Sequence, residues 1–224
     1  MGVMTATTPA RSRGSRLLLV IGLVLVLVGV AILGWFGWQF WGTNVVAQRE
    51  HDRIRTELIE QWESKEPVEQ EKIAGVGLLR IPRFGDDFEV PILNGDDDAT
   101  LTKGVGRYLE GAKPGRVGNL VLSGHRVTHG EPFRDFLELR AGDEVVVETR
   151  THVLTYRLRQ DGDEIRVPFT TSWPLWPVPD PGAAGEEPTE RLITLVTCSE
   201  IFRTDDRNVV VGALESAERK SAAG

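Results

Sequence analysis

The feature that most constrains this chain is an uncharged apolar run, LLLVIGLVLVLVGVAILGWFGWQF, at residues 17–40. As a helix it would extend roughly 36 Å, enough to cross a hydrocarbon core of about 30 Å with some tilt. A secretory signal peptide is the main alternative, but its apolar region is usually shorter and is followed by a small-residue cleavage site. Here the run ends in Trp35, Trp38 and Trp41, as expected at a membrane interface. We therefore expect an uncleaved transmembrane anchor over residues 17–41.

The charges on either side of this run predict its orientation. Arg11, Arg13 and Arg16 precede it without any acidic residue, so residues 1–16 should stay cytoplasmic under the positive-inside rule. All 33 acidic residues follow the run, against 23 of the 26 basic ones, so the part beyond it has a formal charge of −10. This acidity argues against nucleic acid or an anionic membrane surface as a partner. The prediction is a single-pass membrane protein whose catalytic or binding part is extracytoplasmic.

Residues 42–74 are predicted to be a stalk or linker. They are rich in Glu, Gln and Arg, with apolar residues such as Ile54, Leu58 and Trp62 at helical spacing, which favours a partly exposed helix. His51 lies in this segment and is expected to be solvated.

From residue 75 the sequence changes to short β-type runs separated by turn signals. The runs are at residues 76–82, 88–93, 118–125, 143–149, 152–159, 164–169, 192–198 and 208–215. They favour an all-β barrel or sandwich domain over residues 75–216, with a disordered tail at 217–224. Two short helices are expected as insertions, at residues 98–103 and 131–139. The Pro/Gly-rich stretch 170–189 is too long for a simple hairpin, and long loops of this kind are often functional.

The chain has a single cysteine, Cys198, at the end of the run RLITLVTC. In that run Ile193, Leu195 and Thr197 should face one way, and the residues between them the other. An exported protein with one cysteine cannot form an internal disulfide, so this thiol pairs with another molecule, reacts, or is buried and inert. A reactive thiol requires a cation or a proton acceptor nearby.

Two residues are candidates for that role. His125 also stands where an apolar run gives way to a loop, and barrel rims bring such strand ends together. Arg207 follows Cys198 by nine positions and opens the last run, so an antiparallel return would place its donors beside the thiol, facing a developing oxyanion. Each residue also has an ordinary structural interpretation: His125 as a hydrogen-bonded turn histidine and Arg207 as a solvated charge at a strand end. His129 is an alternative to His125, although it lies in a turn.

Other classes of protein fit the sequence less well. A membrane-tethered binding or scaffold module would keep the anchor and barrel but bury Cys198 as an inert residue. An L,D-transpeptidase usually carries its cysteine in a SHGC-like stretch, unlike VTCSEIF at residues 196–202. Among the four histidines only His125 and His129 have H-x₃-H spacing, and they flank a turn, so no metal or cofactor is expected.

The motifs TLVTC (194–198) and SGHR (123–126), together with Arg207, resemble the signature of the sortases, membrane-anchored cysteine transpeptidases of Gram-positive cell surfaces. The resemblance covers residues 72–216. GHRVTHGEPF (124–133), IPRFG (81–85) and the WPVP and PTERLITL stretches (176–179, 188–195) look most like class E, with class D as an alternative. Most class E members carry tyrosine where this chain has His129, a departure that concerns fine specificity.

This resemblance implies a fold and a reaction. The fold is an eight-stranded sortase-type β-barrel with two short inserted helices, preceded by the transmembrane helix. Cys198 would attack the bond between Thr and Gly of an LAxTG or LPxTG sorting signal on a secreted protein. An amine of a cell-wall precursor, such as lipid II, or of a pilin would then resolve the thioester. His125 would act as general acid and base, and Arg207 would stabilise the oxyanion.

Four further residues are expected at the substrate. The resemblance gives Thr197, next to the nucleophile, a role in positioning the peptide. Trp173 and Trp176 in the long loop are expected to line an apolar groove for the leucine of the signal, and His129 is placed with them. No cofactor is implied.

Overall fold

The computed structural model describes residues 13–38, 43–63, 75–198 and 205–220 of the chain. Its contacts divide it into two compact units, residues 1–42 and 43–224, which are described separately. The first unit contains α1 (Arg13–Gly37), whose apolar side chains are exposed. Among the described helices, α1 is the one long and apolar enough to cross a membrane. Of the expected interfacial tryptophans, Trp35 and Trp38 are exposed, and Trp41 lies outside the described residues.

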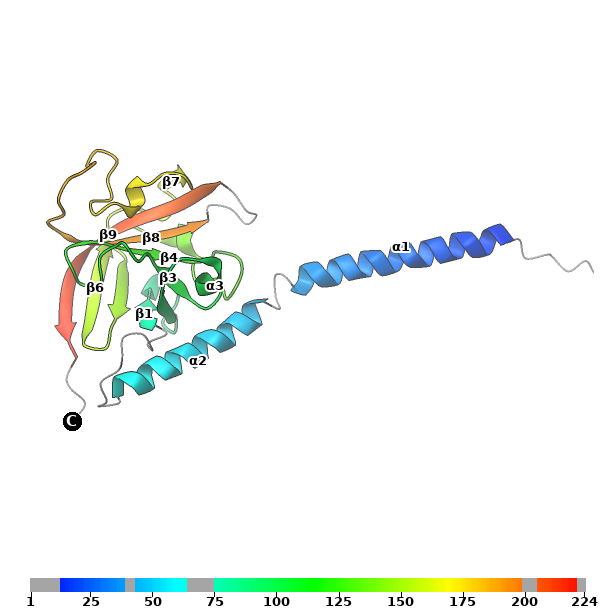
Figure 1. The fold of residues 1–224 in the computed structure, drawn as a ribbon, viewed down its shortest axis with the longest axis horizontal. Coiled ribbons are helices and arrows are strands. Elements are labelled where there is room, and N and C mark those ends of the chain that lie inside the picture. Colours follow the sequence, from blue (N-terminus) through cyan, green and yellow to red (C-terminus); the bar gives the residue numbers. More distant parts are fainter. Residues whose placement is uncertain (1–12, 39–42, 64–74, 199–204, 221–224) are drawn as a thin grey trace, which may run out of the picture. The chain divides into compact units, whose positions relative to one another are not determined.

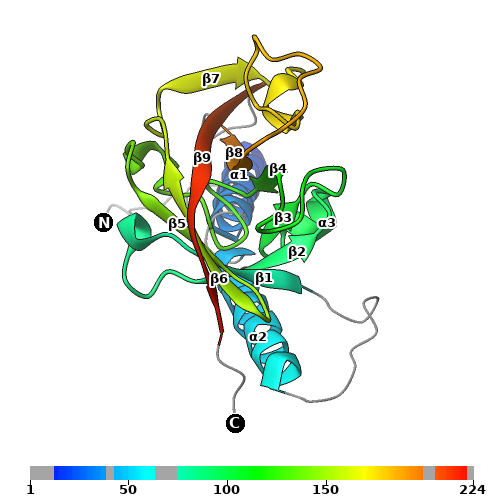
Figure 2. The ribbon, with the colours of Figure 1, turned by 90° about the vertical axis from the view of Figure 1, so that its left-hand side faces the viewer.

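The second unit consists of one long helix and a β-barrel (Figure 1, Figure 2). The helix, α2, spans Thr43–Glu63. The strands are β1 (Gly75–Arg80), β2 (Val90–Asn94), β3 (Val105–Arg107), β4 (Gly118–Ser123), β5 (Glu144–Glu148), β6 (His152–Leu158), β7 (Ile165–Pro168), β8 (Arg191–Cys198) and β9 (Asp206–Arg219). Short helical turns connect them: α3 (Asp98–Leu101) and the 3₁₀ turns η3 (Pro82–Phe84), η4 (Phe136–Glu138) and η5 (Trp173–Leu175).

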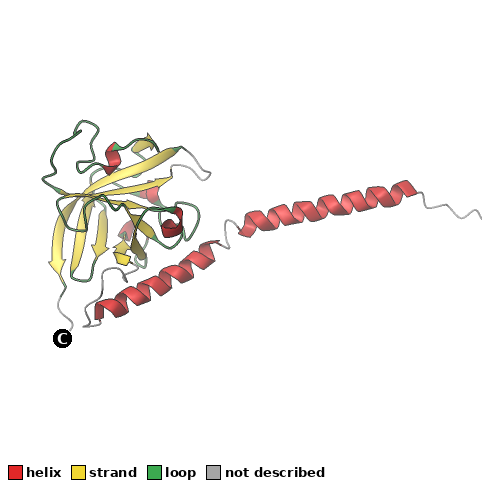
Figure 3. Ribbon diagram, in the orientation of Figure 1, coloured by secondary structure: helices red, strands yellow, loops and turns green. Residues whose placement is uncertain are grey.

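Eight of these strands close into a barrel (Figure 3). Their order is β6-β5-β1-β2-β3-β4-β8-β9, and pairing of β9 with β6 completes the ring. The pairs β2–β3 and β4–β8 are parallel, and the others are antiparallel. β7 pairs only with the first residues of β9, outside the ring. The predicted all-β, eight-stranded fold is therefore confirmed.

The individual elements differ from the prediction in three places. β3 was not predicted, because three residues are too short to show an alternating pattern. The helix expected at residues 131–139 is reduced to the 3₁₀ turn η4. β9 continues to Arg219 because its last residues pair with β6, so residues 217–219 are strand and not part of a disordered tail.

Side chains that point into the barrel form its hydrophobic core. Ile193 and Leu195 of β8 belong to this core together with Leu120 and Leu122 of β4 and Val210 of β9. Since successive residues of a strand point to opposite faces, Thr194, Val196 and Cys198 lie on the outer face of β8. This is the alternation that the sequence predicts.

The helix α2 packs against the outside of β1 and β2 instead of standing away from the barrel. Ile54 and Leu58 are buried against Leu78 and Leu93, and this small cluster is separate from the barrel core. The expectation that His51 is solvated is wrong, since only 7% of its surface is exposed. The helical spacing of Ile54 and Leu58 predicted the helix correctly, but did not reveal what its apolar side covers.

Candidate active site

The nucleophile candidate, Cys198, is the last residue of β8. Its thiol is free and partly exposed, on the outer face of the barrel. β8 lies between β4 and β9, so Cys198 has a neighbour on each side. Partial exposure argues against the alternative in which this cysteine is a buried, inert residue.

Arg207 lies directly opposite Cys198 in the antiparallel pair of β8 and β9. Residues directly opposite each other in such a pair share a face of the sheet, so both side chains belong to the outer face. The Arg207 guanidinium donates to the carbonyl of Asp206 at 3.0 Å and lies 5.9 Å from the ring centre of Phe169. The predicted antiparallel pairing of Arg207 with Cys198 is therefore confirmed, and its role at the oxyanion stays a prediction. A second arginine, Arg203, follows Cys198 by five positions and is the alternative candidate for this role; it lies outside the described residues.

His125 reaches the same face from the other side. β4 runs parallel to β8, with Ser123 paired with Val196. The backbone N–H of Gly124 still donates to the carbonyl of Val196, at 3.2 Å. Continuing this register by one residue beyond Gly124 places His125 alongside Cys198. Continued in this way, the register aligns His125 and Arg207 on the two sides of Cys198, although the three residues are up to 82 positions apart in the sequence.

His125 is the second residue of a tight connection, residues 124–133, which we call the histidine loop. The loop is closed by a hydrogen bond from the N–H of Phe133 to the carbonyl of His125, at 3.0 Å. Gly124 is required here because a Cβ at this position would come within 2.8 Å of the buried Phe133 ring. Removing that glycine would displace either Phe133 or the start of the loop.

The imidazole of His125 rests against that of His129, with ring centres 4.9 Å apart and an angle of 34° between the planes. Burial lowers the pKa of His125, His129 lowers it further, and Asp98 partly opposes the shift. Burial likewise lowers the pKa of His129, against the opposing effect of Asp98. Both rings are therefore neutral at pH 7 and able to accept a proton. His129, expected at the substrate, is in direct contact with His125.

Thr197 braces the end of β8 from the inside. Its side chain is 2% exposed, and its hydroxyl donates to the carbonyl of Gly124 at 2.8 Å. This bond ties the residue before Cys198 to the residue before His125. The predicted role of Thr197 in positioning the peptide stays a prediction.

The loop with Trp173 and Trp176 is anchored on the outer face of the barrel. Asn119 of β4 donates to the carbonyls of Pro174, at 2.8 Å, and Trp176, at 3.0 Å. Its Oδ1 accepts from the Thr194 hydroxyl at 2.7 Å. Thr194 lies on the same face of β8 as Cys198. The turn at residues 173–176, which we call the tryptophan turn, therefore covers the face that carries the thiol. Both indoles are partly exposed.

Sequence reasoning missed Asn119. A signal was present, since an asparagine at the start of an otherwise apolar run, GNLVLS, must find hydrogen-bond partners if it is buried. Its partners are two carbonyls of a loop 55 and 57 positions away, which the run itself does not identify.

Comparison with known proteins agrees with this geometry. A family model for the sortase domain matches residues 79–215, more than half of the chain. The chain belongs to the sortase family. Sortase SrtE1 of Streptomyces coelicolor is 33% identical over 211 residues, covering 90% of this chain and 58% of that protein. Sortase SrtE2 of the same organism is 26% identical over 215 residues, covering 89% of this chain and 83% of that protein.

Solved sortase structures share the barrel. Sortase E from Streptomyces avermitilis is 33% identical, with a TM-score of 0.59, and covers 67% of this chain and 93% of that chain. Sortase E1 from Streptomyces coelicolor, solved with a tripeptide in its active site, is also 33% identical, with a TM-score of 0.54 and the same coverage of both chains. Class E sortases are thus among the proteins that this chain resembles.

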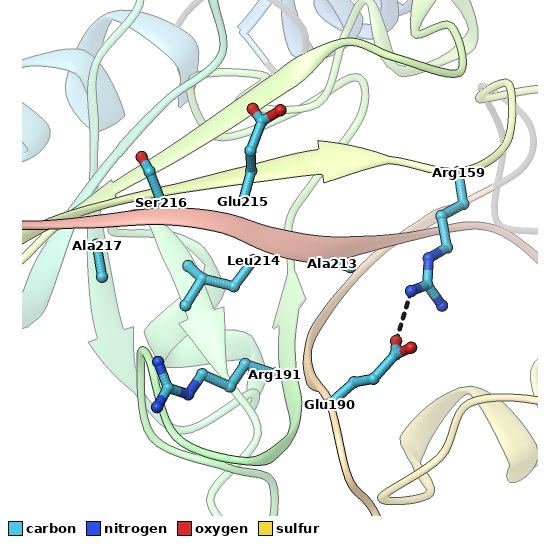
Figure 4. A pocket seen from close by; sticks show the side chains of 8 residues that line it. All are labelled: Arg159, Glu190, Arg191, Ala213, Leu214, Glu215, Ser216 and Ala217. Carbon is cyan, nitrogen blue, oxygen red and sulfur yellow. Dashed lines mark hydrogen bonds and ion pairs between the residues drawn. The ribbon is translucent and has the colours of Figure 1, made fainter.

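A cavity of about 460 Å³ in this sortase lies away from the cysteine (Figure 4). It is lined by Arg191, at the opposite end of β8 from Cys198, by the Arg159–Glu190 ion pair, and by residues 213–217 of β9. Arg191 lies seven positions before Cys198, roughly 23 Å at 3.3 Å per residue, so the cavity is not at the thiol.

Among the described residues there is no cluster of three or more His, Cys, Asp or Glu side chains placed to hold a metal ion. The arrangement at Cys198 instead offers a nucleophile, a neutral imidazole and a fixed cation on one face. These groups suit acyl transfer through a thioester.

Proposed function

We propose that this protein is a membrane-anchored, class E-like sortase that joins secreted proteins to an amine at the cell surface. The observation that carries the proposal is the register on either side of β8, which sets Arg207 opposite Cys198 and continues His125 alongside it. The chain spans 58% of the length of Sortase SrtE1. We therefore infer the activity from the residues of this site and not from the regions of the relative that lie outside the match.

In the first step, the sulfur of Cys198 attacks the carbonyl carbon between Thr and Gly of the sorting signal. The thiol proton passes to the neutral imidazole of His125, and the carbonyl oxygen becomes an oxyanion that the Arg207 guanidinium stabilises. The C–N bond then breaks, and His125 gives the proton to the leaving amine of glycine. The product is a thioester between Cys198 and threonine.

In the second step, an amine attacks the thioester. Its proton passes to His125, the C–S bond breaks, and His125 returns the proton to the Cys198 sulfur. The new amide joins the secreted protein to a cell-wall precursor, such as lipid II, or to a pilin lysine. The same three side chains therefore serve both halves of the reaction.

We propose an LAxTG or LPxTG signal as the substrate. The tryptophan turn that Asn119 fixes over the outer face of the barrel offers Trp173 and Trp176 as an apolar wall for its leucine. His129 belongs to the histidine loop and lies against His125, and Thr197 supports the end of β8 through its bond to Gly124. The tripeptide in the active site of sortase E1 from Streptomyces coelicolor supports recognition of a short peptide by this type of barrel.

The anchor and its orientation belong to the same proposal. α1 has the length and composition of a membrane span, and the arginines before its apolar run favour a cytoplasmic N-terminus. The barrel would then work on the extracytoplasmic side, where its substrates are exported.

The test uses the full-length protein in detergent micelles with LAxTG and LPxTG peptides and an amine such as triglycine. Mass spectrometry should detect the joined product with the parent protein and a thioester adduct of Cys198. Cys198→Ala should abolish both while circular dichroism is unchanged. Turnover by Cys198→Ala above about 10⁻³ of the parent would rule out covalent catalysis by this thiol.

A further inference from the structure

The beginning of α2 is hydrogen-bonded to the histidine loop. Asn44 Oδ1 accepts from the backbone N–H of Gly130 at 3.0 Å, and Asn44 Nδ2 donates to Glu131 Oε1 at 2.6 Å. These partners are 86 and 87 positions from Asn44 in the sequence. One side chain, in the second residue of α2, therefore restrains two successive residues of the loop that contains His125.

The restrained part of the loop has an unusual backbone. His129, Gly130 and Glu131 have φ values of 54°, 82° and 51°, so three consecutive residues are in the left-handed region. Only glycine adopts this conformation without cost, and strained residues persist where the surrounding structure holds them. If the restraint were lost, the loop would relax and the ring of His129 would leave the ring of His125.

The loop also packs against α2 close to these bonds. A Cβ at position 130 would lie 2.7 Å from the ring of His51 and 3.4 Å from the Cβ of Ala47, and both of these α2 residues are buried. A cavity of about 290 Å³ lies beside this contact, with His51, Phe88 and Gly130 among its walls. The two hydrogen bonds of Asn44 add a directional restraint to this packing.

We propose that Asn44 is a positioning residue of the sortase reaction, which fixes the histidine loop through Gly130 and Glu131 and thereby keeps His125 in place at the thiol. Asn44 touches no reacting atom, and the inference rests on the proposed function. It also gives α2 a role in the reaction, since the helix that the sequence presents as a stalk holds part of the catalytic apparatus in position.

The test compares three variants at Asn44 and Glu131 in the full-length protein in micelles. Asn44→Ala removes both hydrogen bonds and should lower kcat about 10-fold with KM for the peptide within about 3-fold, since a small displacement of a catalytic group reduces rate more than binding. Asn44→Asp keeps the acceptor for Gly130 but sets a carboxylate against Glu131, and should lose as much. Adding Glu131→Gln to Asn44→Asp restores this hydrogen bond in the reverse direction, because the amide at position 131 now donates to the carboxylate at position 44. In this double variant kcat should return to within about 3-fold of the parent.

Two controls separate positioning from stability. Arg49→Ala, on the exposed side of α2, should leave kcat and the thermal midpoint unchanged. Leu58→Ala, which removes apolar contact between α2 and the sheet, should lower the thermal midpoint more than Asn44→Ala does. If the loss in Asn44→Ala only follows the fraction of unfolded protein, or the double variant shows no recovery, Asn44 has no positioning role.

The experiment also distinguishes this inference from the proposed function. A parent protein that forms no product, or a Cys198→Ala protein that still does, overturns the proposed function and this inference with it. An active parent with an Asn44→Ala variant within 2-fold of its kcat overturns the positioning role alone.

Discussion

The two proposed catalytic partners of Cys198, Arg207 and His125, are positioned in different ways by the neighbours of β8. Arg207 is part of a continuous antiparallel strand, and its place is set by backbone pairing with β8 on one side and β7 on the other. His125 lies beyond the end of a parallel strand, in a loop with three left-handed residues that α2 contacts. The arginine side is thus fixed by local sheet structure and the histidine side by contacts from distant parts of the chain. Substitutions remote from the site should therefore disturb His125 more than Arg207.

Removing the imidazole itself should give the largest effect of the comparison. His125→Gln keeps a polar side chain of similar size but cannot transfer protons near neutral pH, so kcat should fall about 10³-fold. Peptide-turnover kinetics would measure this, with circular dichroism as the check on folding. A variant that retains a tenth of the parent kcat would show that another group, with His129 nearest, carries the proton.

Changing the guanidinium should cost less, because an oxyanion donor typically contributes about 10²–10³ in rate. Arg207→Ala should lower kcat at least about 10²-fold, and Arg207→Lys should recover little, since lysine keeps the charge but not the planar fork. KM should change much less than kcat, because the oxyanion develops only in the transition state. Arg203→Ala is the matched control and should stay within about 10-fold of the parent; the reverse ranking would mean that Arg203 is the oxyanion donor.

The same contrast explains what the sequence could predict. The return from Cys198 to Arg207 takes nine residues, and the antiparallel pairing and register followed from that short connection. Seven of the eight predicted runs are strands of the barrel, and the run at residues 164–169 is β7, which pairs with β9 outside the ring. By contrast, β3 is too short to show an alternating pattern. The sequence of α2 likewise does not predict that Ile54 and Leu58 pack against β1 and β2. His51 was misassigned for the same reason, because its burial depends on a loop 79 positions away.

The hydrogen-bond partners of the polar residues that support the site could not be predicted from the sequence. Asn44 and Asn119 act through carbonyl, amide and carboxylate groups that lie far from them in the chain. Hydrogen bonds of this kind leave no periodic pattern. The three principal site residues could be predicted because they lie at strand ends. The residues that restrain them do not share any such position in the sequence.

A third prediction concerns the tryptophan turn, which belongs to neither side of the comparison but covers the same face. Asn119→Asp keeps the acceptor for Thr194 but loses both donors to the carbonyls of Pro174 and Trp176. The turn should loosen, raising KM for the peptide about 10-fold with a smaller change in kcat. Burying a carboxylate without those donors should also lower the free energy of unfolding by about 1–3 kcal/mol. Steady-state kinetics and urea unfolding would test both, and an unchanged KM would show that the turn is not part of the peptide site.

The smallest expected effect is a pH dependence of stability, which should come from the histidine side of the site and not from the arginine side. The pKa values of His51, His125 and His129 are all lowered, in each case chiefly by burial, whereas arginine does not titrate in the range considered. Below the ordinary histidine pKa of about 6.5 the unfolded chain therefore binds more protons than the folded one. Stability rises with pH wherever this is so, which means that the histidine contribution is complete above pH 6.5 and is lost as the pH falls through the lowered values.

Carboxylates such as Glu89, whose pKa is also lowered, lose their contribution only below their ordinary value of about 4.3. The interval from pH 7 to pH 5 thus reports mainly on the histidines. We expect the thermal midpoint to fall across this interval, by about 2–4 °C for each kcal/mol lost in a chain of this size. His51→Phe fills the same buried position with a ring that cannot be protonated, so the fall should be smaller in that variant, and smaller again when His125→Gln is added. Thermal unfolding followed by circular dichroism at the two pH values measures the difference, and an equal fall in His51→Phe and the parent would show that the buried contact between α2 and the histidine loop is not sensitive to protonation.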